Sequence, residues 1–381
     1  MKFIQKIFDL GTKTQSEYYK LYCEHNNYSE VARIVGRDVS TVRDSVLKLL
    51  EKASLKNIDH ETGESVGVPE GFLAKKISTC FNKDGEQILQ WVQSTPEHGS
   101  VEDHIKTAVK VLSEDCRGKL EQTDFNGASD DDSLVVYPLT DVHVGMLSWD
   151  RETGENQDLK IIREKVINSY RKLIDGSAKA CVLANLGDYF HANNDKKMTE
   201  HSGNHLDVDG RSMKVFEIGI DILKHLISMA LEKHESVKLV MLKGNHDDML
   251  SIALRYVIAE YAHFNERLEI LDGVTFSKFV FGNTLLAFHH GHSCKMNRIA
   301  SVIATDCREE WGKTEYTNIM MGHIHHESVF EEGNCKVESF RAPCAKDSWH
   351  FESGYRGRRS VYAIYFDRED GECGRKVISV K

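Results

Sequence analysis

Residues 134–143 read Leu134-Val-Val-Tyr-Pro-Leu-Thr-Asp141-Val-His143, an apolar run followed closely by an acid and a histidine. Four later pieces of the chain repeat this order. Their apolar runs are residues 181–186, 237–242, 285–288 and 319–321, and their polar motifs are Gly187-Asp188-Tyr-Phe-His191, Gly244-Asn245-His246-Asp247, His289-His290-Gly291-His292 and Gly322-His323-Ile-His325. Parallel strands that are covered on both faces are apolar throughout, and ligands bind beyond their carboxyl ends. Five such strand ends predict one shared site in an α/β domain.

The residue types in these motifs suit a pair of divalent cations. A carboxylate can bridge two ions, while imidazoles and a carboxamide complete each shell without excess negative charge. Two ions held in this way can clamp a phosphoryl group. A lone Asp-x-His or Gly-His-x-His occurs by chance, and a single histidine at a strand end is more often structural. All five motifs in this order favour a two-metal hydrolase.

The five motifs together resemble the signature of the calcineurin-like metallophosphoesterase superfamily, which reads D-x-H, G-D, G-N-H-[DE], H and G-H-x-H. The resemblance covers about residues 134–363. It implies an α/β fold of two sheets packed face to face with helices outside. It also implies two metal sites that share Asp188 as a bridge. The implied ligands of the first ion are Asp141, His143, Asp188 and His325, and those of the second are Asp188, Asn245, the strand-end histidine and His323.

Three histidines crowd the fourth motif, so the strand-end ligand is ambiguous among His289, His290 and His292. The His-Gly form of the motif points to His290. In the family that the chain resembles, the histidine that matches His246 is not a ligand. It faces the phosphate, where it donates a hydrogen bond or the proton of the leaving group.

The residues around the ligands indicate a subfamily. Protein serine/threonine phosphatases carry G-D-x-x-D-R-G and G-N-H-E, which this chain lacks. The pattern G-D-x-F-H with G-N-H-D and G-H-I-H is similar to DNA repair nucleases of the SbcD type. That resemblance places His191 near the scissile phosphate, and the alternative is that His191 only orients His246 or packs under it. Residues 199–211 resemble metallophosphoesterases carried by phages and are expected to form a substrate-side loop.

Composition predicts a soluble globular protein of two or three domains, because the chain has 381 residues of which 40% are hydrophobic. No apolar run approaches the ~20 residues of a membrane span, and residues 1–10 lack a signal-peptide core. A cytoplasmic location without membrane attachment is therefore expected. The nine cysteines include no C-x-x-C pair and predict neither a disulfide framework nor a zinc ribbon.

The first 56 residues are basic, whereas the rest of the chain is acidic. They hold ten Lys or Arg against seven Asp or Glu, a net charge of +3, which leaves −13 for the remainder of a chain whose total charge is −10. Phosphate contacts dominate affinity for DNA, so this segment is the part expected to meet a polyanion.

The same segment predicts three helices, at residues 16–24, 28–35 and 40–52, with a tight turn at 36–39 and Ser40 as the N-cap of the third helix. Four residues are spaced as in helix-turn-helix modules, where glycine permits the turn and apolar side chains pin two helices together: Ala32, Gly36, Val39 and Val42. The expected DNA contacts are Ser40, Thr41, Arg43 and Lys48. A three-helix protein-interaction module is the alternative.

The remaining elements follow from periodicity and turn residues. Between residues 57 and 133 the sequence predicts a hairpin at 74–81 and 87–93, a helix at 101–114 and a polar linker at 127–132. In the last domain, helices are expected at 158–174, 209–234 and 249–264. From residue 269 onward, hairpins are expected at 274–288, at 328–338 and between 360–366 and 375–380. The expected domains are 1–56, a helix-turn-helix domain; 57–133, an accessory segment and linker; and 134–381, a metallophosphoesterase domain.

These observations predict a Mn²⁺-dependent phosphodiesterase that hydrolyses DNA with two metal ions, for which Mg²⁺, Fe²⁺ and Zn²⁺ are alternatives. DNA is the expected partner, and an oligomer is compatible with the sequence. Three other functions stay open: a small-molecule or cyclic-nucleotide phosphodiesterase, an RNA nuclease, and a DNA-binding regulator with a structural metal core. The last would bind DNA and never cut it.

Overall fold

The structure is a computed structural model that describes residues 3–55, 72–81, 87–96, 116–121, 123–127, 130–193, 197–199, 203 and 205–381. The chain divides into two compact units, Met1–Thr107 and Ala108–Lys381, which are described separately. The domain boundaries expected after residues 56 and 133 stay predictions.

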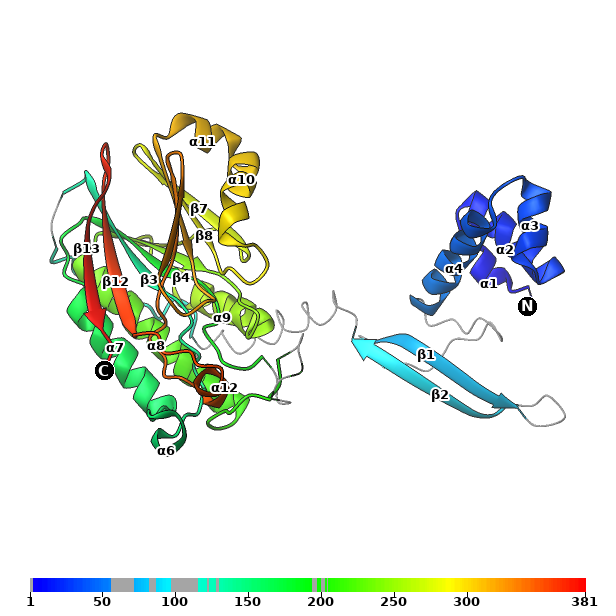
Figure 1. The fold of residues 1–381 in the computed structure, drawn as a ribbon, viewed down its shortest axis with the longest axis horizontal. Coiled ribbons are helices and arrows are strands. Elements are labelled where there is room, and N and C mark those ends of the chain that lie inside the picture. The colour runs from blue at the N-terminus through cyan, green and yellow to red at the C-terminus, as the bar shows by residue number, and fades with distance from the viewer. Residues whose placement is uncertain are drawn as a thin grey trace. The chain divides into compact units, whose positions relative to one another are not determined.

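Among its described residues, the first unit holds four helices and a two-stranded antiparallel hairpin (Figure 1). The elements are α1 (Gln5–Phe8), α2 (Lys13–His25), α3 (Tyr28–Val35), α4 (Val39–Leu55), β1 (Phe72–Phe81) and β2 (Gln87–Pro96). The side chains of Thr12 and Asn27 cap α2 and α3 by accepting from backbone N–H groups of the first turn. The three predicted helices and the predicted hairpin are thus confirmed, while the helix expected at 101–114 lies outside the described residues.

Two expectations for the turn between α3 and α4 are wrong. Helix α4 begins at Val39, so Ser40 lies within its first turn and is not the N-cap. The residue before the helix is Asp38, whose carbonyl accepts from the N–H of Val42. Val39 is 44% exposed and does not pin the helices together, whereas Ala32 and Val42 are buried. Gly36 ends α3 in the left-handed conformation at φ 63°, which a glycine adopts without strain.

The second unit contains two β-sheets that pack face to face. The six-stranded sheet has the order β13-β12-β3-β4-β5-β6, and the five-stranded sheet has the order β10-β11-β9-β8-β7. The strands of the first are β3 (Ser133–Leu139), β4 (Ala180–Asn185), β5 (Ser236–Met241), β6 (Leu268–Ile270), β12 (Ser360–Asp367) and β13 (Gly371–Ser379). Those of the second are β7 (Phe276–Phe281), β8 (Thr284–His289), β9 (Tyr316–Met321), β10 (Ser328–Glu332) and β11 (Cys335–Ser339). Strands β3, β4, β5 and β6 run parallel, as do β8, β9 and β11.

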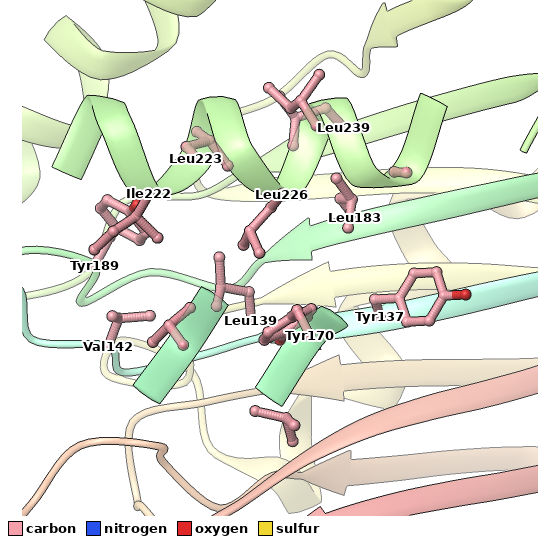
Figure 2. Close-up of a cluster of buried hydrophobic side chains, with 14 of the residues drawn as sticks. Tyr137, Leu139, Val142, Tyr170, Leu183, Tyr189, Ile222, Leu223, Leu226 and Leu239 are labelled. Carbon is pink, nitrogen blue, oxygen red and sulfur yellow. The ribbon is translucent and has the colours of Figure 1, made fainter. Parts of the chain in front are cut away.

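Helices lie on the outer face of each sheet (Figure 1). Helices α7 (Leu159–Leu173), α8 (Ser212–Lys233) and α9 (Asp248–Tyr261) pack on the six-stranded sheet, and α10 (Met296–Asp306), which is followed by α11 (Arg308–Lys313), packs on the five-stranded sheet. Two short helices, α6 (Asp150–Thr153) and α12 (Ser348–Glu352), contact each other. Alternation along β3 explains the layers, because successive side chains point to opposite faces of a sheet. Val135, Tyr137 and Leu139 pack with residues of α7 and α8, and Figure 2 labels Tyr137 and Leu139 in this cluster. Leu134 and Val136 face the second sheet.

The expected architecture is therefore confirmed: two sheets face to face with helices outside, and a separate group of N-terminal helices. Helices α10 and α11 were not among the elements expected after residue 269. Helix α10 buries only a narrow stripe, Ile299, Ala300 and Ile303, against the five-stranded sheet. Among the described residues, no helix is both long enough and apolar enough to cross a membrane.

Candidate metal centre

All five polar motifs come together at the carboxyl ends of β3, β4 and β5 in one sheet and β8 and β9 in the other. Backbone hydrogen bonds join the loops that carry them. The N–H groups of Asp141 and His143 donate to the carbonyls of Gly187 and Asp188, each over 3.1 Å. The N–H of Gly322 donates to the carbonyl of His290 over 2.9 Å. The side chains are thus held on loops that brace one another.

The backbone is strained at these positions. Among the described residues, seven that are not glycine have positive φ, and five of them belong to this cluster: Asp141, His143, Asp188, His323 and His325. Such a conformation costs free energy for a residue with a side chain and persists only when surrounding structure enforces it. Its concentration at one place marks a functional site.

The first group of possible metal donors is Asp141, His143 and His325. His325 Nε2 lies 3.2 Å from Asp141 Oδ1 and 3.2 Å from His143 Nε2. The Asp141 carboxylate accepts from the N–H of His323 over 2.9 Å and from the Thr140 hydroxyl. Thr140 was not expected to take part, because a threonine between strand and motif carries no signal in the sequence.

The second group is Asp188, His290 and His323, with Asn245 beside it. His290 Nε2 lies 3.1 Å from Asp188 Oδ2 and 3.3 Å from Asn245 Oδ1. His290 Nδ1 donates to the carbonyl of Leu186 over 2.9 Å, so Nε2 is the nitrogen that faces the site. A backbone carbonyl commonly fixes a metal-binding histidine in this way.

The other two histidines of the fourth motif are placed differently. His289 ends β8 fully buried, with its ring stacked on Phe276 at 4.4 Å. His292 lies further out, with its ring 5.3 Å from that of His290. Of the three, His290 is the one that the structure brings against Asp188.

This donor set fits divalent cations. Asp141 and Asp188 are buried, and among the described residues their ionic partners are histidines, with no Lys or Arg. Burial opposes protonation of His290, yet the Asp188 carboxylate raises the pKa of His290 to about 9. Burying unpaired carboxylates is costly, so a positive charge is required between them. Mixed carboxylate, imidazole and amide donors are typical of Mn²⁺, Fe²⁺ and Zn²⁺ sites.

His246 and His191 lie beside the first group. His246 Nδ1 donates to the carbonyl of His191 over 2.9 Å, which leaves Nε2 as the free nitrogen of a partly exposed ring. His191 is buried, and its Nδ1 lies 3.0 Å from Nδ1 of His143. Through these contacts His191 orients the rings of His143 and His246. The same three histidines also form a third group whose nitrogens are close enough together to bind one metal ion.

Asp247 is a site residue that the sequence did not reveal beyond its place in the motif. Its buried carboxylate accepts from the N–H groups of Tyr189, Phe190 and Gly244 over 2.7, 3.0 and 2.9 Å. It therefore ties the Asp188 loop to the loop that carries Asn245. Burial and the nearby Asp188 raise the pKa of Asp247 to about 6. Gly244 must lack a side chain, because a Cβ there would overlap Asp188 Oδ1.

Replacing Asp247 with alanine is expected to lower the free energy of unfolding by about 3 kcal/mol or more, since three buried donors would each lose a partner worth about 1–3 kcal/mol. Urea unfolding measures this change. Asp248→Ala is the matched control, because its carboxylate only pairs with Lys243 near the surface over 2.9 Å. Such pairs contribute about 0–1 kcal/mol. Equal stability of the two variants would contradict the bracing role of Asp247.

Two cavities flank the metal centre. One of about 460 Å³ is lined by Val144, Ala192, Lys197 and Arg211 among others, so part of the expected substrate-side loop does border a cavity. The other, of about 330 Å³, is lined by His325 together with His350 and several arginines. His350 belongs to none of the five motifs, so its place beside His325 could not be predicted.

Comparison with known proteins gives matches among solved structures only, since no family model and no curated protein matches this chain. A conserved uncharacterized protein and predicted phosphoesterase from Streptococcus pneumoniae is 12% identical, with 65% of this chain and 98% of that chain covered at a TM-score of 0.28. Vps29 complexed with Zn²⁺ from Entamoeba histolytica is 13% identical, with 65% and 99% covered at 0.30. YfcE, a phosphoesterase from E. coli, is 12% identical, with 65% and 100% covered at 0.29. Sequence identities and TM-scores this low do not indicate the activity of this chain, which depends on its own residues.

Proposed function

We propose that this protein is a metal-dependent phosphodiesterase that cleaves DNA, with Mn²⁺ as its native metal. The observation that carries the proposal is the pair of donor groups at converging strand ends, each with a buried carboxylate and two histidines. Five of these six residues, all except His290, have positive φ. The first ion is assigned to Asp141, His143, Asp188 and His325. The second is assigned to Asp188, Asn245, His290 and His323.

When bound, the two ions would lower the pKa of a water molecule and neutralise the charge of the phosphoryl oxygens. The protein's own side chains position the ligands and supply a proton to the leaving group. His246 holds its ring through the carbonyl of His191, so Nε2 is free to carry the proton that a departing 3′-oxygen needs. His191 in turn keeps the His143 ring in place through the contact between their Nδ1 atoms.

The N-terminal helices support DNA as the substrate. Ser40, Thr41, Arg43 and Lys48 are all exposed on α4, and the net charge of the first 56 residues is positive. Helix α3, the turn at Gly36 and helix α4 follow one another as in a helix-turn-helix module. These residues are assigned to bases and backbone phosphates.

The full-length protein is expected to cut DNA with Mn²⁺ and to be inactive with a chelator, and its affinity for duplex DNA should fall steeply with salt. Each lost phosphate contact flattens the dependence of log K on log salt by about one unit. The double variant Arg43→Ala, Lys48→Ala should therefore bind more weakly and with a slope lower by about two. Fluorescence anisotropy across a salt series measures this.

Lys20→Ala with Arg33→Ala is the control pair, from the same basic segment but outside α4. An unchanged salt slope for the α4 variant would contradict the assignment and favour a protein-interaction module. Hydrolysis of a small phosphodiester by a protein that neither binds nor cuts DNA would favour a small-molecule or cyclic-nucleotide substrate.

A further inference from the structure

A continuous series of aromatic rings leads from solvent to a proposed metal ligand. His350 stacks on His325 with 4.8 Å between ring centroids and 18° between planes. Trp349 meets His350 edge-on at 5.1 Å and stacks with Tyr355 at 5.5 Å and 26°. Asp347 fixes this series, because its Oδ1 accepts from His350 Nδ1 over 2.6 Å. Neither the sequence motifs nor the proposed chemistry accounts for this arrangement.

The outer members of the series are open to solvent. Trp349 is 54% exposed and Tyr355 is 47% exposed. Large aromatic rings usually bury their apolar faces, and an exposed pair beside a catalytic centre offers a flat apolar surface. The pair therefore has room to stack on another planar group.

The neighbouring cavity is strongly cationic. Its lining includes Lys346, Arg356, Arg358 and Arg359, and none of its lining residues is acidic. Glu155, just outside the lining, pairs with Arg359 and with Lys346 over 3.2 Å. Within the part of the chain that the structure describes, the acceptors of Arg356 are the backbone carbonyls of Phe351 and Tyr355. Among the described residues no side-chain partner is recorded for Arg358, which is exposed. An excess of positive charge thus remains available to an anion.

We propose that Trp349 and Tyr355, with Arg356 and Arg358, form a nucleotide subsite next to the scissile phosphate. An unpaired base stacks on the exposed rings, and its phosphate binds the cationic cavity. Stacked aromatics beside a basic groove are how proteins hold single-stranded nucleic acid without reading its sequence. A base in a continuous duplex is stacked on its neighbours and unavailable to these rings. The inference rests on the proposed function and deepens it: the substrate is DNA with an unpaired nucleotide next to the cleaved bond.

The test is an abasic scan of a single-stranded oligonucleotide in the presence of Mn²⁺. Removing the base at one position beside the cleaved bond should lower kcat/KM of the wild-type protein by roughly 5- to 150-fold, the effect of one base–aromatic stack. Trp349→Ala should lose a similar factor on the intact strand and lose nothing more on the abasic strand. Trp349→Phe should restore sensitivity to the missing base.

Phe264→Ala serves as the matched control, because Phe264 is 67% exposed and lies beyond the far end of α9 from the metal centre. Arg358→Ala tests the subsite independently of ring packing and should lower the salt slope of strand binding by about one unit. If the wild-type protein cuts DNA but its kcat/KM is the same at every abasic position, the subsite is wrong while the proposed function stands. The subsite is also wrong if the loss in kcat/KM from Trp349→Ala and the loss from the abasic nucleotide multiply when the two are combined. A wild-type protein that cuts no DNA yet hydrolyses a small phosphodiester would instead overturn the proposed function.

Discussion

Asp188→Asn is expected to lose most of the bound metal and all measurable phosphodiester hydrolysis. Asp188 is a buried member of the second donor group, and its Oδ2 lies 3.1 Å from His290 Nε2. An amide has the same shape but no charge, so it cannot compensate two divalent ions. The fold should persist, because an amide oxygen can still accept from the N–H of His246, which lies 2.8 Å from Asp188 Oδ1. Metal content and the rate of DNA cleavage are the measurements.

Asp221→Asn is the matched control for the loss of one negative charge. Asp221 is partly exposed and pairs with Arg163 on the surfaces of α8 and α7, so its metal content and rate should equal those of the wild type. An Asp188→Asn protein that retains two tightly bound metal ions and full activity would contradict the assignment of Asp188 as the bridging ligand.

His246→Ala is expected to keep its metals and its affinity for DNA while its turnover of DNA falls by ~10²–10⁴, the usual contribution of general acid–base catalysis. The loss should depend on the leaving group. A 3′-alkoxide needs a proton, whereas a nitrophenolate departs without one, so a nitrophenyl phosphodiester should lose far less. Steady-state kinetics on both substrates, with metal analysis of the variant, measure the two effects.

His263→Ala is the control, since His263 is an exposed histidine that faces Arg117 beyond the end of α9. Loss of metal from His246→Ala would show that the trio of His143, His191 and His246 holds an ion, and the role of proton donor would then be wrong. Equal losses on the alkoxide and nitrophenolate substrates would also contradict that role.

The strands that carry the site could be predicted because strands buried on both faces appear in the sequence as unbroken apolar runs. Strand β4 is apolar over almost its whole length, since one face packs on helices and the other on the second sheet. The motif residues come directly after such runs, so their convergence follows from the geometry of parallel strands. Identity of the strand-end histidine is harder to predict, since His289 and His290 differ by one residue and only the end of β8 decides which one faces Asp188.

What could not be predicted depends on contacts between distant segments. Asp247 braces a loop 57 and 58 residues away, and no local pattern distinguishes it from an N-terminal helix acid. His350 lies in α12, a helix of only five residues, and its ring stacks on that of His325, which is 25 residues earlier in the chain. Val39 looked like a packing residue from its spacing, but the helix begins there and leaves it half exposed.

Anomalous diffraction from crystals of the full chain grown with Mn²⁺ determines whether two divalent ions occupy this centre. We expect two peaks about 3.5–4 Å apart, the usual separation in two-metal hydrolases. One should touch Asp141, His143 and His325, the other Asn245, His290 and His323, and Asp188 should touch both. A single peak, or two peaks that share no carboxylate, would contradict this expectation.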